Sequence, residues 1–292
     1  MIAFLGLGNM GAPMAANLVT AGLKVTGYDP VTTVPDGVTA AASAVDAVRG
    51  ASVVVTMLPS GTHVLDCYRE IVPAAEPGTL FLDCSTIDVA DARAAAELAT
   101  SAGHLAADAP VSGGVVGAQA GTLTFMVGAS AEAFAAAEPH LSHMGARSVH
   151  CGESGAGQAA KICNNMILGV SMIAVAEAFV LGEKLGLTHQ ALFDVASTAS
   201  GQCWALTTNC PVPGPVPGSP ANRDYAGGFA SGLMLKDLRL AQAAAQAQDV
   251  STQLGRRAAE LYEEFVGQDG PQRDFSAVIT AVRDGLLDKD AT

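Results

Sequence analysis

The stretch "IAFLGLGNMGAPMAANL", residues 2–18, decides the fold of this chain. An apolar run of strand character leads into a turn that carries Gly6, Gly8 and Gly11, and the alanine-rich segment after it is typical of a helix. Asp29 ends the next apolar run, "KVTGYD", about 20 residues beyond the glycine turn. A strand, a glycine turn, a helix and an acidic residue in this order predict a dinucleotide-binding βαβ unit.

The glycine turn also predicts which cofactor binds. Glycines permit close backbone approach, and the N-terminus of the following helix attracts a pyrophosphate. The Asp29 carboxylate can accept from both ribose hydroxyls, whereas it would repel the 2′-phosphate of NADP. No Lys or Arg lies between Lys24 and Arg49 to hold that phosphate, so the sequence favours NAD. The cofactor-binding residues expected in the turn are Gly6, Leu7, Gly8, Asn9, Met10 and Gly11.

Composition excludes several classes of protein. With 15 Lys plus Arg against 28 Asp plus Glu, the net charge is −13, so no nucleic-acid partner is expected. The apolar start lacks a basic region and a cleavage site, and reads as a strand rather than a signal peptide. Residues 162–182 are the longest apolar run, but they contain two Asn and Glu177, which favours a buried helix over a membrane span.

The cysteines and histidines indicate the redox state of the protein and whether it binds a metal. The six cysteines form no CxxC pair, which favours reduced thiols in a cytoplasmic protein. His140 and His143 have no accompanying Cys or acidic ligand set, so no metal site is expected.

The chain divides into two parts by its pattern. Up to about residue 150, β-rich runs alternate with alanine-rich helical stretches, which predicts an α/β, doubly wound Rossmann-type domain with a mainly parallel sheet, here bounded at residues 1–158. Residues 159–292 are expected to form a second, all-helical domain for substrate binding and oligomerisation, with helices at 157–186, 188–199, 232–248 and 252–267. The proline-rich segment 209–225 interrupts them and is expected to be a fixed loop.

Two further segments carry candidate chemistry. In "DAPVSGG", Ser112, Gly113 and Gly114 form a small polar turn that can offer a hydroxyl and bare N–H groups to a carboxylate, although a plain loop is an equal alternative. In "GAGQAAKICNN", Lys161 and Asn165 are four residues apart and share one face of an otherwise apolar helix. A lysine partly desolvated near a domain junction has a lowered pKa, which suits it to exchange a proton with an alcohol.

Together, "GLGNMG", "DAPVSGG", "GAGQAAKICNN" and "LKDLRLA" resemble the β-hydroxyacid dehydrogenase family over almost the whole chain. The resemblance implies that Lys161 is the catalytic residue and that Ser112, Gly113, Gly114 and Asn165 bind the substrate. It adds cofactor contacts from the segment "TMLPSG", from "DCSTID" and from the second domain. These contacts are Met57, Leu58, Pro59, Thr86 and Lys236, with Asp237 beside the last.

The resemblance also implies a substrate. The segment 200–229, in which the proline-rich loop follows a Cys-Trp pair, is similar to the subgroup of this family that oxidises (S)-3-hydroxyisobutyrate. The alternatives are a reductase of tartronate semialdehyde or a related short hydroxyacid, and a non-catalytic NAD-binding regulator. The long apolar helix needs more cover than one small domain provides, so a homodimer or homotetramer is expected.

Overall fold

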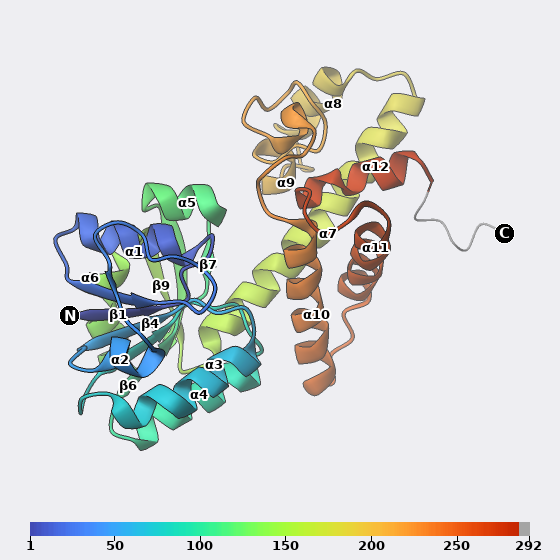
Figure 1. Cartoon of the computed structure of the whole chain (residues 1–292). Helices are drawn as coiled ribbons and strands as arrows, with labels where there is room; N and C mark the ends of the chain where they lie inside the picture. Colours follow the sequence, from blue (N-terminus) through green and yellow to red (C-terminus); the bar gives the residue numbers. More distant parts are fainter. Residues whose placement is uncertain (286–292) are drawn as a thin grey trace. The chain divides into compact units, whose positions relative to one another are not determined.

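The computed structural model describes residues 1–285 and divides into two compact units, Met1–Lys161 and Ile162–Thr292. The boundary between the units falls within helix α7 (Ala156–Lys184). Each unit has its own hydrophobic core, and each is described below by itself (Figure 1).

The first unit is built on one twisted sheet. Its strands are β1 (Ile2–Leu5), β2 (Val25–Tyr28), β3 (Thr39–Ala40), β4 (Val53–Thr56), β5 (Leu80–Asp83), β6 (Leu105–Asp108), β7 (Val111–Ser112), β8 (Leu123–Ala129) and β9 (Gly145–Gly152). The order is β3-β2-β1-β4-β5-β6-β8-β7, with β9 also paired to β8. The strands β1 to β6 pair in parallel, β8 is antiparallel to β6 and β7, and β9 is parallel to β8.

Helices cover both faces of this sheet, as expected for a doubly wound fold (Figure 1). One face packs against α1 (Gly11–Thr20), α5 (Gly114–Ala120) and α6 (Ala131–Leu141). The other face packs against α2 (Ala44–Val48), α3 (Gly61–Ile71) and α4 (Val89–Ser101). Consecutive residues of β1 face opposite sides of the sheet. Phe4 belongs to the core on one face and Leu5 to the core on the other.

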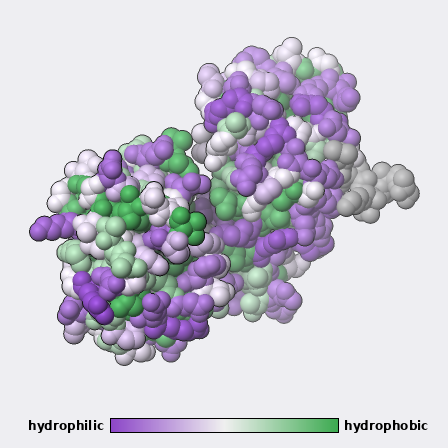
Figure 2. Space-filling view, viewed as in Figure 1, coloured by the Kyte–Doolittle hydropathy of each residue, from purple (hydrophilic) through white to green (hydrophobic). Residues whose placement is uncertain are grey.

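The second unit is helical. After α7 come α8 (His189–Ala196), α9 (Trp204–Thr207), α10 (Ser231–Ala247), α11 (Gln253–Asp269) and α12 (Val278–Arg283). Met172 and Phe179 of α7, Leu238 of α10 and Tyr262 of α11 meet in its core. Figure 2 shows hydrophilic residues over most of the viewed face of this unit, with hydrophobic residues exposed in smaller groups. The expected α/β domain followed by a helical domain is therefore confirmed.

The proline-rich segment 209–225 is a loop held by buried polar contacts. Asp274 accepts hydrogen bonds from the side chain of Asn209 (2.9 Å) and from the backbone N–H of Phe229 (2.7 Å), and the Tyr225 hydroxyl donates to the Pro211 carbonyl (2.9 Å). One feature differs from the expectation of no helix, because Pro220–Arg223 form a single 3₁₀ turn. Proline is tolerated there because it occupies the first turn, where its missing N–H has no helical partner to lose.

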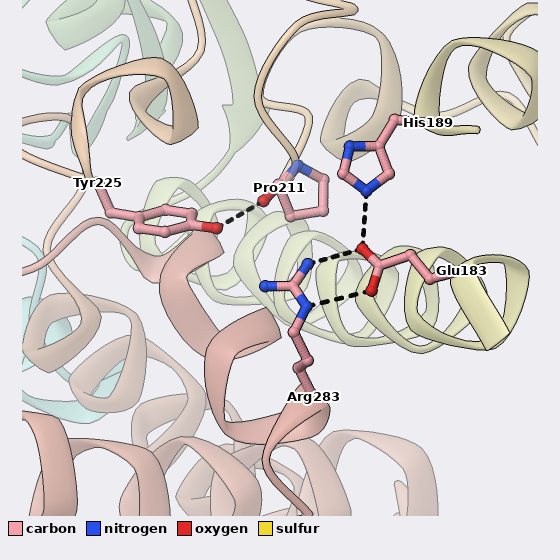
Figure 3. A network of polar contacts seen from close by, with 5 residues as sticks. All are labelled: Glu183, His189, Pro211, Tyr225 and Arg283. Carbon is pink, nitrogen blue, oxygen red and sulfur yellow. Dashed lines mark hydrogen bonds and ion pairs between the residues drawn. The ribbon is translucent and has the colours of Figure 1, made fainter.

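The end of α7 is tied to two other helices of the second unit (Figure 3). The Glu183 carboxylate accepts from the Arg283 guanidinium of α12 (2.7 Å) and contacts the His189 ring of α8 at 2.7 Å. The Arg283 hydrogen bond is the largest cause of the lowered pKa of Glu183.

Among the described residues, α7 alone is long and apolar enough to cross a membrane, and 44% of its most apolar window is buried inside the protein. Ile167 and Leu181 of this helix, and Leu185 just beyond its end, are largely exposed.

Candidate active site

The glycine turn after β1 has the geometry that a dinucleotide requires. Gly6 has a φ of +91°, and a Cβ there would lie 2.3 Å from the Met57 carbonyl oxygen. A Cβ at Gly11 would lie 1.9 Å from the Gly6 carbonyl oxygen, so α1 can begin this close to β1 only with glycine. Gly8 is exposed and a Cβ there would meet nothing within 4 Å, which leaves its backbone open to a ligand. No acidic side chain lies in the first turn of α1, so its positive end is available to a phosphate.

Asp29 follows β2 and is fixed against the glycine turn. One carboxylate oxygen accepts from the Leu7 N–H (2.7 Å), and the other accepts from the N–H groups of Val31 (2.8 Å) and Thr32 (2.9 Å). Burial alone would raise the pKa of Asp29, but these hydrogen bonds outweigh it and lower the pKa. A carboxylate has about four acceptor positions, so room remains for a ribose hydroxyl.

Two neighbouring loops lie at the same edge of the sheet, because parallel strands end together there. Met57, Leu58 and Pro59 follow β4, and Thr86 follows β5. The Leu58 N–H donates to the Ser85 hydroxyl (2.8 Å), which joins the two loops next to Thr86. Met57, Leu58 and Thr86 are half-buried, and Pro59 is exposed. The structure thus gathers the expected cofactor residues of the first unit along one edge of the sheet.

The turn at Ser112–Gly114 connects β7 to α5. Gly113 has a φ of +128° and Gly114 a φ of +60°, and both values favour glycine. A Cβ at Gly113 would lie 3.1 Å from the Leu123 side chain, whereas a Cβ at Gly114 would meet nothing within 4 Å. The turn therefore presents a half-buried hydroxyl and backbone that carries no side chain at Gly114.

Lys161 lies in the second turn of α7 and is only 6% exposed. The start of this helix is anchored by Asp108, which accepts from the N–H groups of Gly155 (2.6 Å) and Gln158 (2.9 Å). A Cβ at Gly157 would lie 2.2 Å from the Met126 carbonyl oxygen, so the helix begins in close contact with the sheet. The backbone that carries Lys161 is consequently held in place by the first unit itself.

The remaining candidate residues belong to the second unit. Asn165, one turn beyond Lys161 on α7, is 2% exposed and donates to Asp237 of α10 at 2.6 Å. Lys236, next to Asp237, is half-buried. The second unit therefore joins Asn165 to Asp237 by a hydrogen bond, and Lys236 precedes Asp237 on α10.

The residues present fit an NAD molecule in the first unit. The exposed Gly8 backbone, the uncompensated N-terminus of α1 and the Asp29 carboxylate match its pyrophosphate and ribose in charge and hydrogen bonding. Within residues 1–285 there is no group of three His, Cys, Asp or Glu side chains that could hold a metal ion.

Comparison with known proteins decides the family. A family model described as the NAD binding domain of 6-phosphogluconate dehydrogenase matches residues 1–152, and one described as NAD-binding of NADP-dependent 3-hydroxyisobutyrate dehydrogenase matches residues 155–282. A protein of Mycobacterium tuberculosis named "Probable 3-hydroxyisobutyrate dehydrogenase" is 56% identical over 97% of both chains. The chain belongs to the 3-hydroxyisobutyrate dehydrogenase family.

A solved structure and a second named relative are similar to this chain over nearly its whole length. The solved Mycobacterium tuberculosis 3-hydroxyisobutyrate dehydrogenase with L-serine has a TM-score of 0.94 at 56% identity, covering 97% of this chain and 98% of that one. A Pseudomonas aeruginosa protein named "NAD-dependent L-serine dehydrogenase" is 48% identical over 95% of this chain and 96% of its own. The prediction of an NAD-dependent oxidoreductase of this family is confirmed, which removes the alternative of a non-catalytic regulator.

Two polar residues of the site were not singled out from the sequence. Asp108 and Gln158 lie inside the quoted motifs, but their contacts join residues about 50 and 70 positions apart. An acidic residue at the end of the otherwise apolar run "HLAAD" is the signal that could have indicated a buried carboxylate.

Proposed function

We propose that this protein oxidises (S)-3-hydroxyisobutyrate to methylmalonate semialdehyde with NAD, as a step of valine breakdown in the cytoplasm. The observation that carries the proposal is the 56% identity to a named 3-hydroxyisobutyrate dehydrogenase over nearly the full length of both chains. The buried Lys161 on an anchored helix supports it, because this reaction needs one positioned base.

The proposed roles follow from the chemistry of an alcohol oxidation. The glycine turn and Asp29 would hold NAD, which would supply the acceptor for the hydride that leaves the carbon carrying the hydroxyl. The Nζ atom of Lys161 takes the hydroxyl proton, and in the reverse direction it returns this proton to the aldehyde oxygen. Asn165, held by Asp237, orients the hydroxyl, while Ser112 and the glycines beside it hold the carboxylate.

L-serine is a second candidate substrate, favoured by the Pseudomonas relative's name and by the ligand in the solved Mycobacterium relative. Both compounds are 3-hydroxycarboxylates with a primary alcohol, and they differ in whether carbon 2 carries a methyl or an ammonium group. An ammonium group needs acceptors around it, whereas a methyl group needs apolar contact.

Steady-state kcat/KM with NAD tests the substrate. We expect (S)-3-hydroxyisobutyrate to exceed L-serine by at least about tenfold, roughly what one apolar group in a fitted pocket contributes. A preference for L-serine would transfer the assignment to the second candidate. Faster reduction of tartronate semialdehyde than of methylmalonate semialdehyde, each with NADH, would favour the alternative of a tartronate semialdehyde reductase.

We further propose that the protein forms a homodimer or homotetramer. The second unit exposes large apolar side chains on α7, on α8 and in the turn between them, and α8 has no buried residue. Light scattering on the purified protein tests this, and a monomer at micromolar concentration would contradict it.

A further inference from the structure

The side chain of Gln158 is fully buried and uses both ends of its carboxamide. Its oxygen accepts from the Ile87 N–H (3.1 Å), and its nitrogen donates to the Ser85 carbonyl (2.7 Å). The carboxamide thus holds the backbone on either side of Thr86. A carboxamide offers an acceptor and a donor together on one planar group without having to be protonated, and of the two residues that carry one, Asn has the shorter side chain.

The same contact continues into the loop after β4. The Ser85 hydroxyl accepts from the Leu58 N–H (2.8 Å) and donates to the buried Asp83 carboxylate (2.6 Å). Thr56, at the end of β4, also donates to this carboxylate at 2.8 Å. One connected set of hydrogen bonds therefore runs from the first turn of α7 to both loops that carry the expected cofactor contacts.

Gln158 and Lys161 are three residues apart on α7, and Asp108 fixes the start of that helix to β6. Because the helix is anchored, the Gln158 carboxamide sets where the Thr86 loop lies relative to Lys161. A displacement of about 1 Å between reacting groups can cost about 100-fold in rate.

We propose that Gln158 is a positioning residue that fixes the Thr86 loop, and with it the bound cofactor, relative to the proton-transferring amine of Lys161. The proposal rests on the proposed function for the role of Lys161. The hydrogen-bonded link between α7 and the two loops is independent of that role.

Two substitutions test the link. Gln158→Met keeps the length of the side chain and removes both hydrogen bonds, so we expect kcat to fall about 10- to 100-fold and NADH to bind several-fold more weakly. Gln158→Glu places an anion against the Ser85 carbonyl at neutral pH. When protonated, it again offers one acceptor and one donor, and burial raises its pKa into an accessible range.

NADH binding by fluorescence titration, measured from pH 5.5 to 8.5, is the decisive readout. We expect Gln158→Glu to recover toward the wild-type dissociation constant as the pH falls. The carboxyls of Asp83 and Asp108 belong to the same hydrogen-bond network, so Gln158→Met, which has no titratable group at position 158, is titrated over the same pH range and should show no such recovery. A merely structural role would lower Tm without changing NADH affinity in the folded protein, and would show no recovery by protonation.

Gln246→Met and Gln246→Glu, at an exposed position of α10, are the matched controls and should behave as wild type. Wild-type kcat and NADH affinity in both Gln158 variants at every pH would overturn the inference. If Gln158→Met does not fold, the pH dependence of Gln158→Glu carries the test. Failure of the proposed function is distinguishable, because the wild-type protein would then turn over none of the hydroxyacids while the NADH titrations remain measurable.

Discussion

The side-chain amide of Asn165 donates a hydrogen bond of 2.6 Å to Asp237, and both side chains are almost completely buried. Asp237 therefore fixes which way the amide of Asn165 points, and the proposed substrate contact depends on that orientation.

Asp237→Asn should lower kcat about 10- to 100-fold, because a hydrogen bond to a charged group contributes about 1.5–3 kcal/mol. Steady-state kinetics at saturating substrate measure the change. Asp249→Asn, an exposed carboxylate just beyond the same helix, is the control. Unchanged kcat in Asp237→Asn would show that the orientation of Asn165 is unimportant.

Asp108 makes stability depend on pH. Burial raises its pKa from 3.8 to about 6, despite the N–H groups of Gly155 and Gln158 that favour the charged form. Since the folded-state pKa is the higher one, the stability contributed by this proton is complete below pH 3.8 and is lost as the pH rises through about 6. The loss corresponds to about 3 kcal/mol in order of magnitude.

Urea denaturation of wild type and Asp108→Asn at pH 5 and pH 7.5 measures the part of this loss that occurs above pH 5, about 1.4 kcal/mol. The wild-type protein should lose stability relative to the variant between these values. Carboxylates common to both proteins cancel in the comparison. If the difference in the free energy of unfolding between wild type and Asp108→Asn were constant with pH, or changed in the opposite direction, the raised pKa of Asp108 would be refuted.

Asp29 should set the preference for NAD over NADP. Its carboxylate is ionised and held beside the glycine turn by the N–H groups of Leu7, Val31 and Thr32. Asp29→Asn removes the charge that would repel a 2′-phosphate, so the ratio of kcat/KM for NAD to that for NADP should fall at least about tenfold, the equivalent of 1.4 kcal/mol. Asp36→Asn controls for net charge, and an unchanged ratio in Asp29→Asn would place the selectivity elsewhere.

Two substitutions in the second unit should differ sharply in their effect on stability. Asp274 is 1% exposed and accepts several hydrogen bonds beside the proline-rich loop, so Asp274→Asn, which leaves buried donors without an acceptor, should cost about 1–3 kcal/mol for each donor left unsatisfied. Arg283 pairs with Glu183 at a partly exposed site, so Arg283→Ala should cost at most about 1 kcal/mol (Figure 3). Thermal denaturation compares them, and a reversed order would be inconsistent with the buried role of Asp274.

Local patterns were enough to predict the fold, and they singled out the residues of the candidate site, whose roles stay predictions. The glycine spacing and Asp29 indicated the βαβ unit, and the four-residue separation of Lys161 and Asn165 placed them on one helix, because both signals depend only on neighbours along the chain. The antiparallel pairing of β8 with β6 was not predicted, since alternation of strands and helices does not define strand direction at a sheet's edge. The hydrogen-bond partners of Gln158 could not be predicted from the sequence, because only the folded chain brings Ser85 and Ile87 to it.

Transfer of the substrate proton by the Lys161 amine is the step on which the proposed reaction depends most. Lys161→Ala, with the exposed Lys184→Ala on the same helix as control, tests it by pairing kcat with the NADH dissociation constant. We expect kcat to fall about 100- to 10,000-fold in Lys161→Ala while NADH affinity stays within a few-fold of wild type. Turnover close to that of wild type in Lys161→Ala would contradict proton transfer by this amine.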